Sequence, residues 1–237
     1  MRPQVLLLHG FLGRGADWDA VRAGLPPDWR VAAPDLPGHG ANLRAVATMD
    51  AASAALAEVD EPADVVGYSM GGRLALHLAV RHPDAVRRLV LVSASPGLRS
   101  PAERARRRQL DEERAQAIER DLPAFLDDWY HLPLFGLPDA LRQRVTADRL
   151  AHADPAGLAA SLRGMGTGAQ PSHWGALAGI SAPTTAVAGD RDAKFVRLAR
   201  EMAESGDVRV QVVPGAAHLL PIERPDALAS LLTDVLD

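Results

Sequence analysis

The chain has 237 residues, of which 47% are hydrophobic and 24% charged, and its formal net charge is -4 at pH 7. This size and composition predict one globular α/β core with an insertion rather than two domains, and the charge gives no reason to expect nucleic-acid binding. Cysteine is absent, which excludes disulfides, a thiolate nucleophile and a cysteine-based metal site.

Apolar runs along the chain are short. None reaches the length of a membrane span, and the first run, residues 5–8, is too short for a secretory signal. We therefore expect a cytoplasmic protein without membrane insertion. The sequence does not indicate an oligomeric state. The basic residues are nearly all arginines, and Lys194 is the only lysine.

Strand and helix patterns alternate over most of the chain at the spacing of βαβ units, which predicts a mostly parallel, doubly wound sheet. Continuous apolar runs indicate strands buried on both faces of such a sheet. The predicted strands are residues 5–8, 30–33, 64–67, 88–93, 184–188 and 208–213, and the predicted helices between and after them are residues 16–23, 48–59, 73–80, 193–204 and 224–236.

Five polar residues of the predicted core receive local interpretations. Asp17 is a candidate cap of the first helix. Asp35 and His39 lie in a loop rich in turn residues, and we expect their side chains to hold that loop by hydrogen bonds. His77 is expected on the surface of its helix, as is His82, and the histidines show no metal-ligand spacing.

From residue 97 to residue 174 the strand patterns disappear. Arginine-rich helical segments take their place, over residues 101–120, 122–130, 138–149 and 155–165. We predict a helical cap over residues 97–174, inserted into a core made of residues 1–96 and 175–237. Its expected role is to close over the substrate pocket.

The stretch from Gly67 to Gly71, with Ser69 at its centre, follows a predicted strand and precedes a predicted helix. It matches the G-x-S-x-G nucleophile elbow, which presents a serine hydroxyl on a sharp strand-to-helix turn. Glycines two residues before and after the serine remove Cβ atoms that would clash in this turn.

Two backbone amides are candidates for an oxyanion hole. One belongs to Met70, directly after the elbow serine. The other belongs to Phe11, in the His-Gly loop that follows the first strand, which supplies the second donor in proteins with this elbow.

A serine hydroxyl needs an imidazole to take its proton and a carboxylate to orient that imidazole. Ser69, Asp192 and His218 follow the order serine, acid, histidine expected for this elbow, and each lies in a loop just after a predicted strand. They should therefore converge at one end of the sheet. Asp190 is the alternative acid.

These motifs together resemble the α/β-hydrolase superfamily over the whole chain. The finer resemblance is to the MenH family, the 2-succinyl-6-hydroxy-2,4-cyclohexadiene-1-carboxylate synthases of menaquinone biosynthesis. It extends into the predicted cap, where superfamily members usually diverge. The segments that carry it are residues 67–73, 95–98, 102–107, 125–130, 164–171 and 189–195.

The resemblance implies an α/β-hydrolase fold and a lyase rather than a hydrolase. Ser69, activated by His218, would remove a ring proton, and the substrate would eliminate pyruvate. A polycarboxylate substrate suits an arginine-rich pocket. The resemblance implies that Arg73, Arg107 and Arg149 bind substrate carboxylates. For Arg73 the alternative is a structural salt bridge to the cap.

The pocket walls implied by the resemblance are Tyr68, Trp129 and Tyr130. We expect a small-molecule substrate and no metal or other cofactor. The chain departs from the MenH pattern at Ala217, where the family usually has glycine, and in the apolar stretch 219–221 after His218. A carboxylesterase or other serine hydrolase of a small ester or lactone is therefore the alternative function.

Overall fold

A single six-stranded sheet organises the computed structural model, which describes residues 4–43 and 46–237. Every strand pair is parallel, and the strand order is β2-β1-β3-β4-β5-β6. The predicted parallel, doubly wound α/β sheet is therefore confirmed. The strands are β1 (Gln4–Leu8), β2 (Arg30–Ala32), β3 (Ala63–Tyr68), β4 (Val86–Val92), β5 (Thr184–Gly189) and β6 (Val208–Val213).

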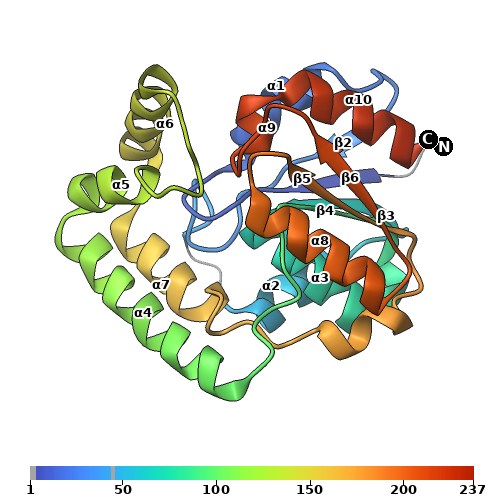
Figure 1. The fold of residues 1–237 in the computed structure, drawn as a ribbon, viewed down its shortest axis with the longest axis horizontal. Helices are drawn as coiled ribbons and strands as arrows, with labels where there is room; N and C mark the ends of the chain where they lie inside the picture. The colour runs from blue at the N-terminus through green and yellow to red at the C-terminus, as the bar shows by residue number, and fades with distance from the viewer. Residues whose placement is uncertain (1–3, 44–45) are drawn as a thin grey trace.

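Helices cover both faces of this sheet (Figure 1). The 3₁₀ segments are η1 (Gly15–Trp18), η2 (Pro83–Ala85) and η3 (Trp174–Gly179). The α-helices are α1 (Asp19–Ala23), α2 (Met49–Leu56), α3 (Met70–Arg81), α4 (Pro101–Arg120), α5 (Leu122–Tyr130), α6 (Asp139–His152), α7 (Pro155–Met165), α8 (Ala193–Ser205), α9 (Leu220–Glu223) and α10 (Pro225–Leu236).

Alternate residues of each strand face opposite sides of the sheet, so the strands contribute to two cores. Leu7 and Val66 pack in one core with residues of α1 and α10. Their neighbours Leu8 and Val65 pack in the other core with residues of α2, α3 and α8. Because both faces are buried, the strands appear in the sequence as unbroken apolar runs.

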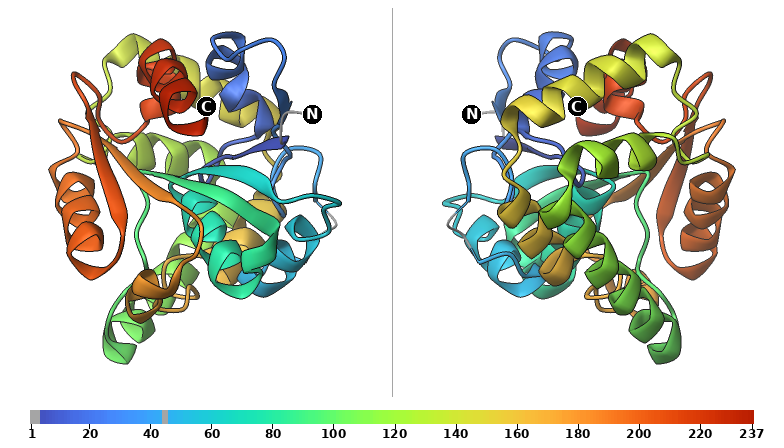
Figure 2. Two further views of the ribbon diagram at one scale, coloured as in Figure 1. Left: turned by 90° about the vertical axis from the view of Figure 1, so that its right-hand side faces the viewer. Right: turned by 90° about the vertical axis from the view of Figure 1, so that its left-hand side faces the viewer.

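The helices α4 to α7 lie together on one side of the molecule, between β4 and β5 in the chain (Figures 1 and 2). Helix α4 packs along α7, and α5 bridges α4 and α6. A capping box begins α4: the Ser100 side chain accepts the Glu103 amide, and the Glu103 carboxylate accepts the Ser100 amide. No helix in the described part of the chain has the length and hydropathy needed to cross a membrane.

Two local expectations differ from the structure. Asp17 is not the N-cap residue, because the segment begins as 3₁₀ turn η1 with Arg14 at its N-cap, but its carboxylate accepts the Arg14 amide at 3.3 Å as part of a capping box. His77 is not on a helix surface but fully buried, with its ring nitrogens 3.0 Å from His173 Nε2 and 2.9 Å from Asp50 Oδ1. Helix α3 lies between the sheet and α2, so it has little solvent-facing surface.

Candidate active site

The elbow around Ser69 is a sharp turn between β3 and α3. Ser69 has φ 50° and ψ -107°, a backbone conformation that costs free energy for any residue with a side chain. A Cβ atom at Gly67 would collide with the carbonyl of Gly71, and one at Gly71 would collide with the carbonyl of Leu8. Both glycines are therefore required by close backbone approach.

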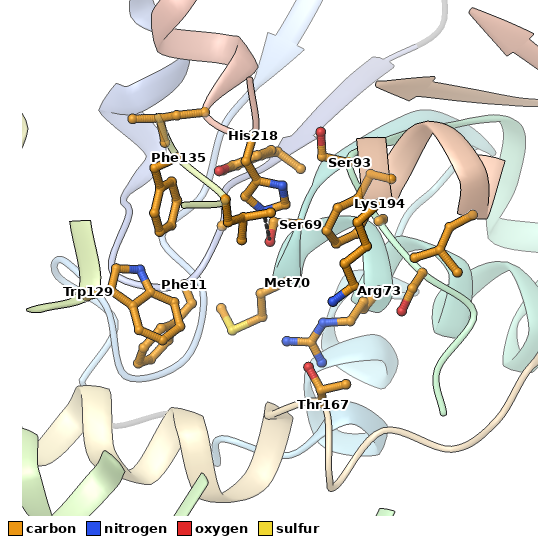
Figure 3. A pocket seen from close by; sticks show the side chains of 18 of the residues that line it. Phe11, Ser69, Met70, Arg73, Ser93, Trp129, Phe135, Thr167, Lys194 and His218 are labelled. Atoms are coloured by element: carbon orange, nitrogen blue, oxygen red, sulfur yellow. Dashed lines mark hydrogen bonds between the residues drawn. The ribbon is translucent and has the colours of Figure 1, made fainter. Parts of the chain in front are cut away.

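The structure brings Ser69, His218 and Asp192 together into one hydrogen-bonded chain. Figure 3 shows Ser69 and His218 facing each other. His218 Nε2 lies 3.1 Å from Ser69 Oγ, and His218 Nδ1 lies 2.7 Å from Asp192 Oδ2. Both His218 and Asp192 are buried. This geometry allows the imidazole to take the Ser69 proton while the carboxylate accepts the Nδ1 proton.

Asp190, the alternative acid, has a different partner. Its Oδ1 accepts the amide of Gly215 at 2.8 Å, and the residue is exposed. Asp192 also accepts the Phe195 amide at 3.3 Å, so it caps α8 while it contacts His218. Of these two acids, only Asp192 contacts the imidazole.

Aromatic rings surround His218. The ring centroids of Phe195, Tyr68 and Phe135 lie 4.6, 5.5 and 5.7 Å from the imidazole centroid. Burial raises the pKa of Tyr68 well above its ordinary value, so its phenol stays protonated. Packing of these three rings around the imidazole holds it in one orientation beside Ser69.

A cavity of about 230 Å³ opens in front of Ser69 and His218. Its walls come from the loops after the strands and from the helices α4 to α7. Figure 3 shows Phe11, Trp129 and Phe135 on one side, and Arg73, Lys194 and Thr167 on the other. Of the residues predicted from the sequence, the cavity is lined by Phe11, Tyr68, Ser69, Met70, Arg73, Arg107, Trp129, Tyr130, Arg149 and His218.

Phe11 and Met70, whose amides are predicted as oxyanion donors, line the same cavity as Ser69. The Met70 amide begins α3, where a helix leaves its first N–H groups without an intrahelical acceptor. Phe11 occupies a tight turn closed by a 3.0 Å hydrogen bond from the Gly13 amide to the Gly10 carbonyl, and Leu12 has φ 67° in this turn.

Two neutral histidines hold this turn and the loop after β2. His39 Nε2 accepts the Leu12 amide at 3.2 Å, and His9 Nε2 accepts the Leu36 amide at 2.9 Å. Burial lowers the pKa of His9 to about 4 and that of His39 to about 3. Asp35 accepts the amides of Gly15 and Ala41, so the polar loop residues serve the loop itself.

Arg73 has no carboxylate partner among the residues that the structure describes. Its guanidinium donates to the Met165 carbonyl at 2.7 Å, so its contact with α7 is a hydrogen bond and not the salt bridge considered as an alternative. Burial, and secondly the charge of Arg107, lowers the pKa of Arg73 to about 9. A buried cation in this state favours a bound anion.

Arg107 is half-buried and partly neutralised. Its Nε donates to Asp111 Oδ1 at 2.7 Å. Asp111 is buried and accepts the Gly168 amide with its other oxygen at 2.9 Å. The carboxylate thus fixes Arg107 against the loop that follows α7.

Arg149 is fully engaged. Its two terminal nitrogens each lie 2.7 Å from an oxygen of Asp17, and its Nε lies 3.3 Å from the Tyr130 hydroxyl. Burial opposes its charge, but Tyr130 and Asp17 outweigh burial and raise the pKa of Arg149. A substrate carboxylate would have to displace Asp17 from this bidentate pair.

Several cavity residues were not predicted as site residues, among them Phe135, Thr167, Lys194 and Phe195. Lys194 had a signal in the sequence, because it is the only lysine and lies two residues after Asp192. The other three had none of comparable strength. In the described ranges, 4–43 and 46–237, no group of three or more histidines and acids could hold a metal ion.

Ala217, where the chain departs from the MenH sequence pattern, is held by a hydrogen bond from its backbone. The Ala217 amide donates to Glu223 Oε2 at 3.0 Å, and the residue is buried. Arg191 also contacts this carboxylate at 2.9 Å. The loop before His218 is therefore anchored to α9 with alanine in place of the usual glycine.

Comparison with known proteins identifies relatives over the full length of the chain. The alpha/beta hydrolase family model matches residues 5–231. A Bacillus subtilis (strain 168) protein that carries the provisional name 2-succinyl-6-hydroxy-2,4-cyclohexadiene-1-carboxylate synthase is 36% identical, over 98% of this chain and 89% of its own.

Solved structures agree with this relationship. The structure of MenH from S. aureus matches with a TM-score of 0.91 and 30% identity, over 99% of this chain and 93% of the other. A malate-bound thermophilic esterase from Thermogutta terrifontis matches with a TM-score of 0.81 and 28% identity, over 98% of this chain and 88% of the other. The chain is thus an α/β-hydrolase-fold enzyme, and it belongs to the alpha/beta hydrolase family and, within it, to the MenH family.

Proposed function

We propose that the protein is a lyase that eliminates pyruvate from a polycarboxylate cyclohexene. Its product would be 2-succinyl-6-hydroxy-2,4-cyclohexadiene-1-carboxylate, the compound in its relatives' names. One observation carries this proposal. The cavity that holds Ser69 Oγ is also lined by Arg73 and Arg107, and a neutral ester has no use for such cations.

In the proposed reaction Ser69 and His218 act together as the base. The imidazole takes the Ser69 proton through the 3.1 Å contact, and Ser69 Oγ removes a proton from a ring carbon. A ring C=C bond forms as the C–O bond to the leaving group breaks, and pyruvate departs as its enolate. The proton held by His218 then returns to that enolate, so no acyl-enzyme forms.

Neighbouring groups support this chemistry. Asp192 stabilises the imidazolium through its 2.7 Å contact with Nδ1. The amides of Phe11 and Met70 are proposed to donate to an oxygen on which negative charge develops. Trp129, Tyr68 and Tyr130 are proposed to hold the ring of the substrate, and helices α4 to α7 to act as a cap that excludes water.

The first prediction tests both the reaction and the roles of these residues. The wild-type protein should release pyruvate from the menaquinone-pathway precursor, measured by a coupled lactate dehydrogenase assay. Ser69→Ala should lower kcat by roughly 10⁴- to 10⁶-fold, because the base is removed. Asp192→Asn should lower it by about 10⁴-fold, whereas Asp190→Asn should retain most of the activity, since Asp190 does not contact His218.

A serine hydrolase is the second candidate, favoured by the likeness to the Thermogutta terrifontis esterase and by the same three residues. Turnover of p-nitrophenyl esters without pyruvate release would decide for the hydrolase. Unchanged activity of Ser69→Ala on both substrates would remove Ser69 from either mechanism.

A further inference from the structure

Lys194 stands out in a chain with 26 basic residues, because arginine occupies every other basic position. A general preference for arginine does not explain the one exception. The exception lies on the wall of the cavity that holds Ser69 and His218. A compact ammonium on a flexible stem differs from a guanidinium in shape and hydration, so this position has a local requirement.

The carboxylates around the cavity are already occupied. Asp17 pairs with Arg149, Asp111 pairs with Arg107, and Asp192 accepts from His218. Within residues 4–43 and 46–237, neither Lys194 nor Arg73 has a carboxylate oxygen within 4.0 Å. Two positive charges on the cavity wall therefore have no ion-pair partner among the described residues.

Lys194, Arg107 and Arg73 all line the cavity, and we call them a row because their exposure decreases in this order from the surface inward. Lys194 is exposed as a residue although its ammonium is partly desolvated, the Arg107 side chain is 26% exposed, and Arg73 is 9% exposed. The charge of Arg107 acts on both of the others and lowers the pKa of each, after the larger effect of burial. Figure 3 shows the Arg73 and Lys194 side chains reaching into the same part of the cavity, beside Thr167.

Phe195 gives Lys194 a defined place at the mouth. The Lys194 ammonium lies 5.3 Å from the centroid of the Phe195 ring, and that ring lies 4.6 Å from the imidazole of His218. The ammonium is thereby kept beside the reacting groups without an ion pair of its own. A row of like charges along a cleft attracts anions and speeds their entry.

We propose that Lys194 is a substrate-binding residue, the outer member of a row with Arg107 and Arg73 that captures a carboxylate of the substrate at the cavity mouth. The identity of the bound anion rests on the proposed function. The anion-binding site itself does not. Arg149, held by Asp17, lies outside this row.

The first test measures binding without turnover. Succinate, a simple dicarboxylate, is titrated at constant ionic strength into the wild-type protein, Lys194→Met and Lys194→Arg, and binding is followed by isothermal titration calorimetry. Lys194→Met should weaken binding roughly tenfold, because a charge-assisted contact is lost. Lys194→Arg keeps the charge but not the compact ammonium, so it should weaken binding by roughly threefold, less than Lys194→Met.

Arg197→Met is the matched control. Arg197 lies one turn further along α8, is exposed, and does not line the cavity. Its replacement removes the same charge from the same helix and should leave succinate binding unchanged. Equal effects of Lys194→Met and Arg197→Met, or the absence of saturable succinate binding in the wild type, would overturn the proposal.

The second test uses turnover of the polycarboxylate substrate. Lys194→Met should lower kcat/KM and flatten its dependence on ionic strength, with kcat nearly unchanged, because entry and capture are affected rather than chemistry. A fall in kcat at unchanged KM would overturn the assignment to binding. If the wild type releases no pyruvate but succinate binding still depends on Lys194, the proposed function fails and the anion site stands.

Discussion

At the scale of single residues, the arginines around the cavity fall into two groups according to their partners. Arg149 is neutralised by Asp17 in a bidentate pair and is only 4% exposed. Arg73 is almost as buried but donates only to a backbone carbonyl. The first arrangement stabilises the fold, whereas the second leaves a charge for a ligand.

This difference predicts that replacement of Arg149 lowers the free energy of unfolding much more than replacement of Arg73. Arg149→Met should lower the free energy of unfolding by about 3–5 kcal/mol, because Asp17 would be left as an unpaired, mostly buried carboxylate. Arg73→Met should change it by less than about 1 kcal/mol, because the variant loses one hydrogen bond and also the cost of a buried charge. Urea unfolding monitored by circular dichroism measures both.

Arg144→Met, at an exposed position of the same helix as Arg149, is the control for loss of charge and helix propensity. An Arg149→Met variant as stable as Arg144→Met would show that the pair with Asp17 contributes little, and would return Arg149 to the set of residues available to a substrate carboxylate.

The sequence predicts residues better when their signal is local. Ser69 and Gly71 lie in one short motif, and His218 follows a predicted strand, so their convergence could be anticipated. The partner of Arg149 could not, because Asp17 lies 132 residues away and had a plausible local role as a helix cap. Pairings between distant charged residues depend on packing that no local pattern encodes.

At the scale of elements, the loops after β1 and β2 are fastened to each other by imidazoles rather than by ion pairs. His9 and His39 each accept a backbone amide with Nε2, and each ring donates from Nδ1 to a carbonyl, of Gly10 and Pro37 respectively. Protonation of either Nε2 would replace an accepted hydrogen bond with a clash between donors. The loops therefore require both rings to be neutral.

This requirement makes stability depend on pH. In the unfolded chain the histidines bind protons near pH 6.5, but in the folded protein burial lowers the pKa of His9 to about 4 and of His39 to about 3. The unfolded state binds more protons between these values, so stability should fall as pH decreases from 6.5 toward 4. Each histidine contributes up to about 1.4 kcal/mol per pH unit.

Urea unfolding at pH 7, 6 and 5 tests this prediction. The variant His39→Asn should be less stable at pH 7 and should show a shallower decline with decreasing pH. His131→Asn, at a half-exposed position of the 97–174 segment, should decline as steeply as the wild type. Equal declines for His39→Asn and His131→Asn would contradict the assignment to His39.

Secondary structure followed the sequence closely, with differences mainly at element ends. Helix α6 extends to His152, where residue 149 was expected as its end, and α2 ends at Leu56 rather than near residue 59. The wrong expectation for His77 has a different origin. Its ring contacts His173 and Asp50, which lie 96 and 27 residues away, and no local pattern encodes such pairings.

At the scale of the whole molecule, the helices of the 97–174 segment have no separate core. Ile118 of α4 and Leu126 of α5 belong to the same cluster as Trp18 and Leu228, which cover one face of the sheet. Met165 of α7 belongs to the cluster on the other face. The segment is an insertion in the chain, but its apolar residues complete the two cores of the sheet.

Shared cores predict that cap and sheet unfold together. Differential scanning calorimetry should show one transition with a calorimetric enthalpy equal to the van't Hoff enthalpy. Fluorescence of Trp129 and far-ultraviolet circular dichroism should give the same midpoint. Two resolved transitions would instead indicate that the 97–174 segment and the sheet unfold as separate units.

The backbone conformation of Ser69 bears on how variants of this protein should be judged. Its φ of 50° is one that glycine adopts without cost, whereas serine holds it only because the surrounding fold imposes it. Glycine at this position would relax the turn but would have no hydroxyl. A selection for thermal stability alone would therefore favour inactive molecules at this site, and resistance to heat cannot serve as a proxy for activity in libraries of this enzyme.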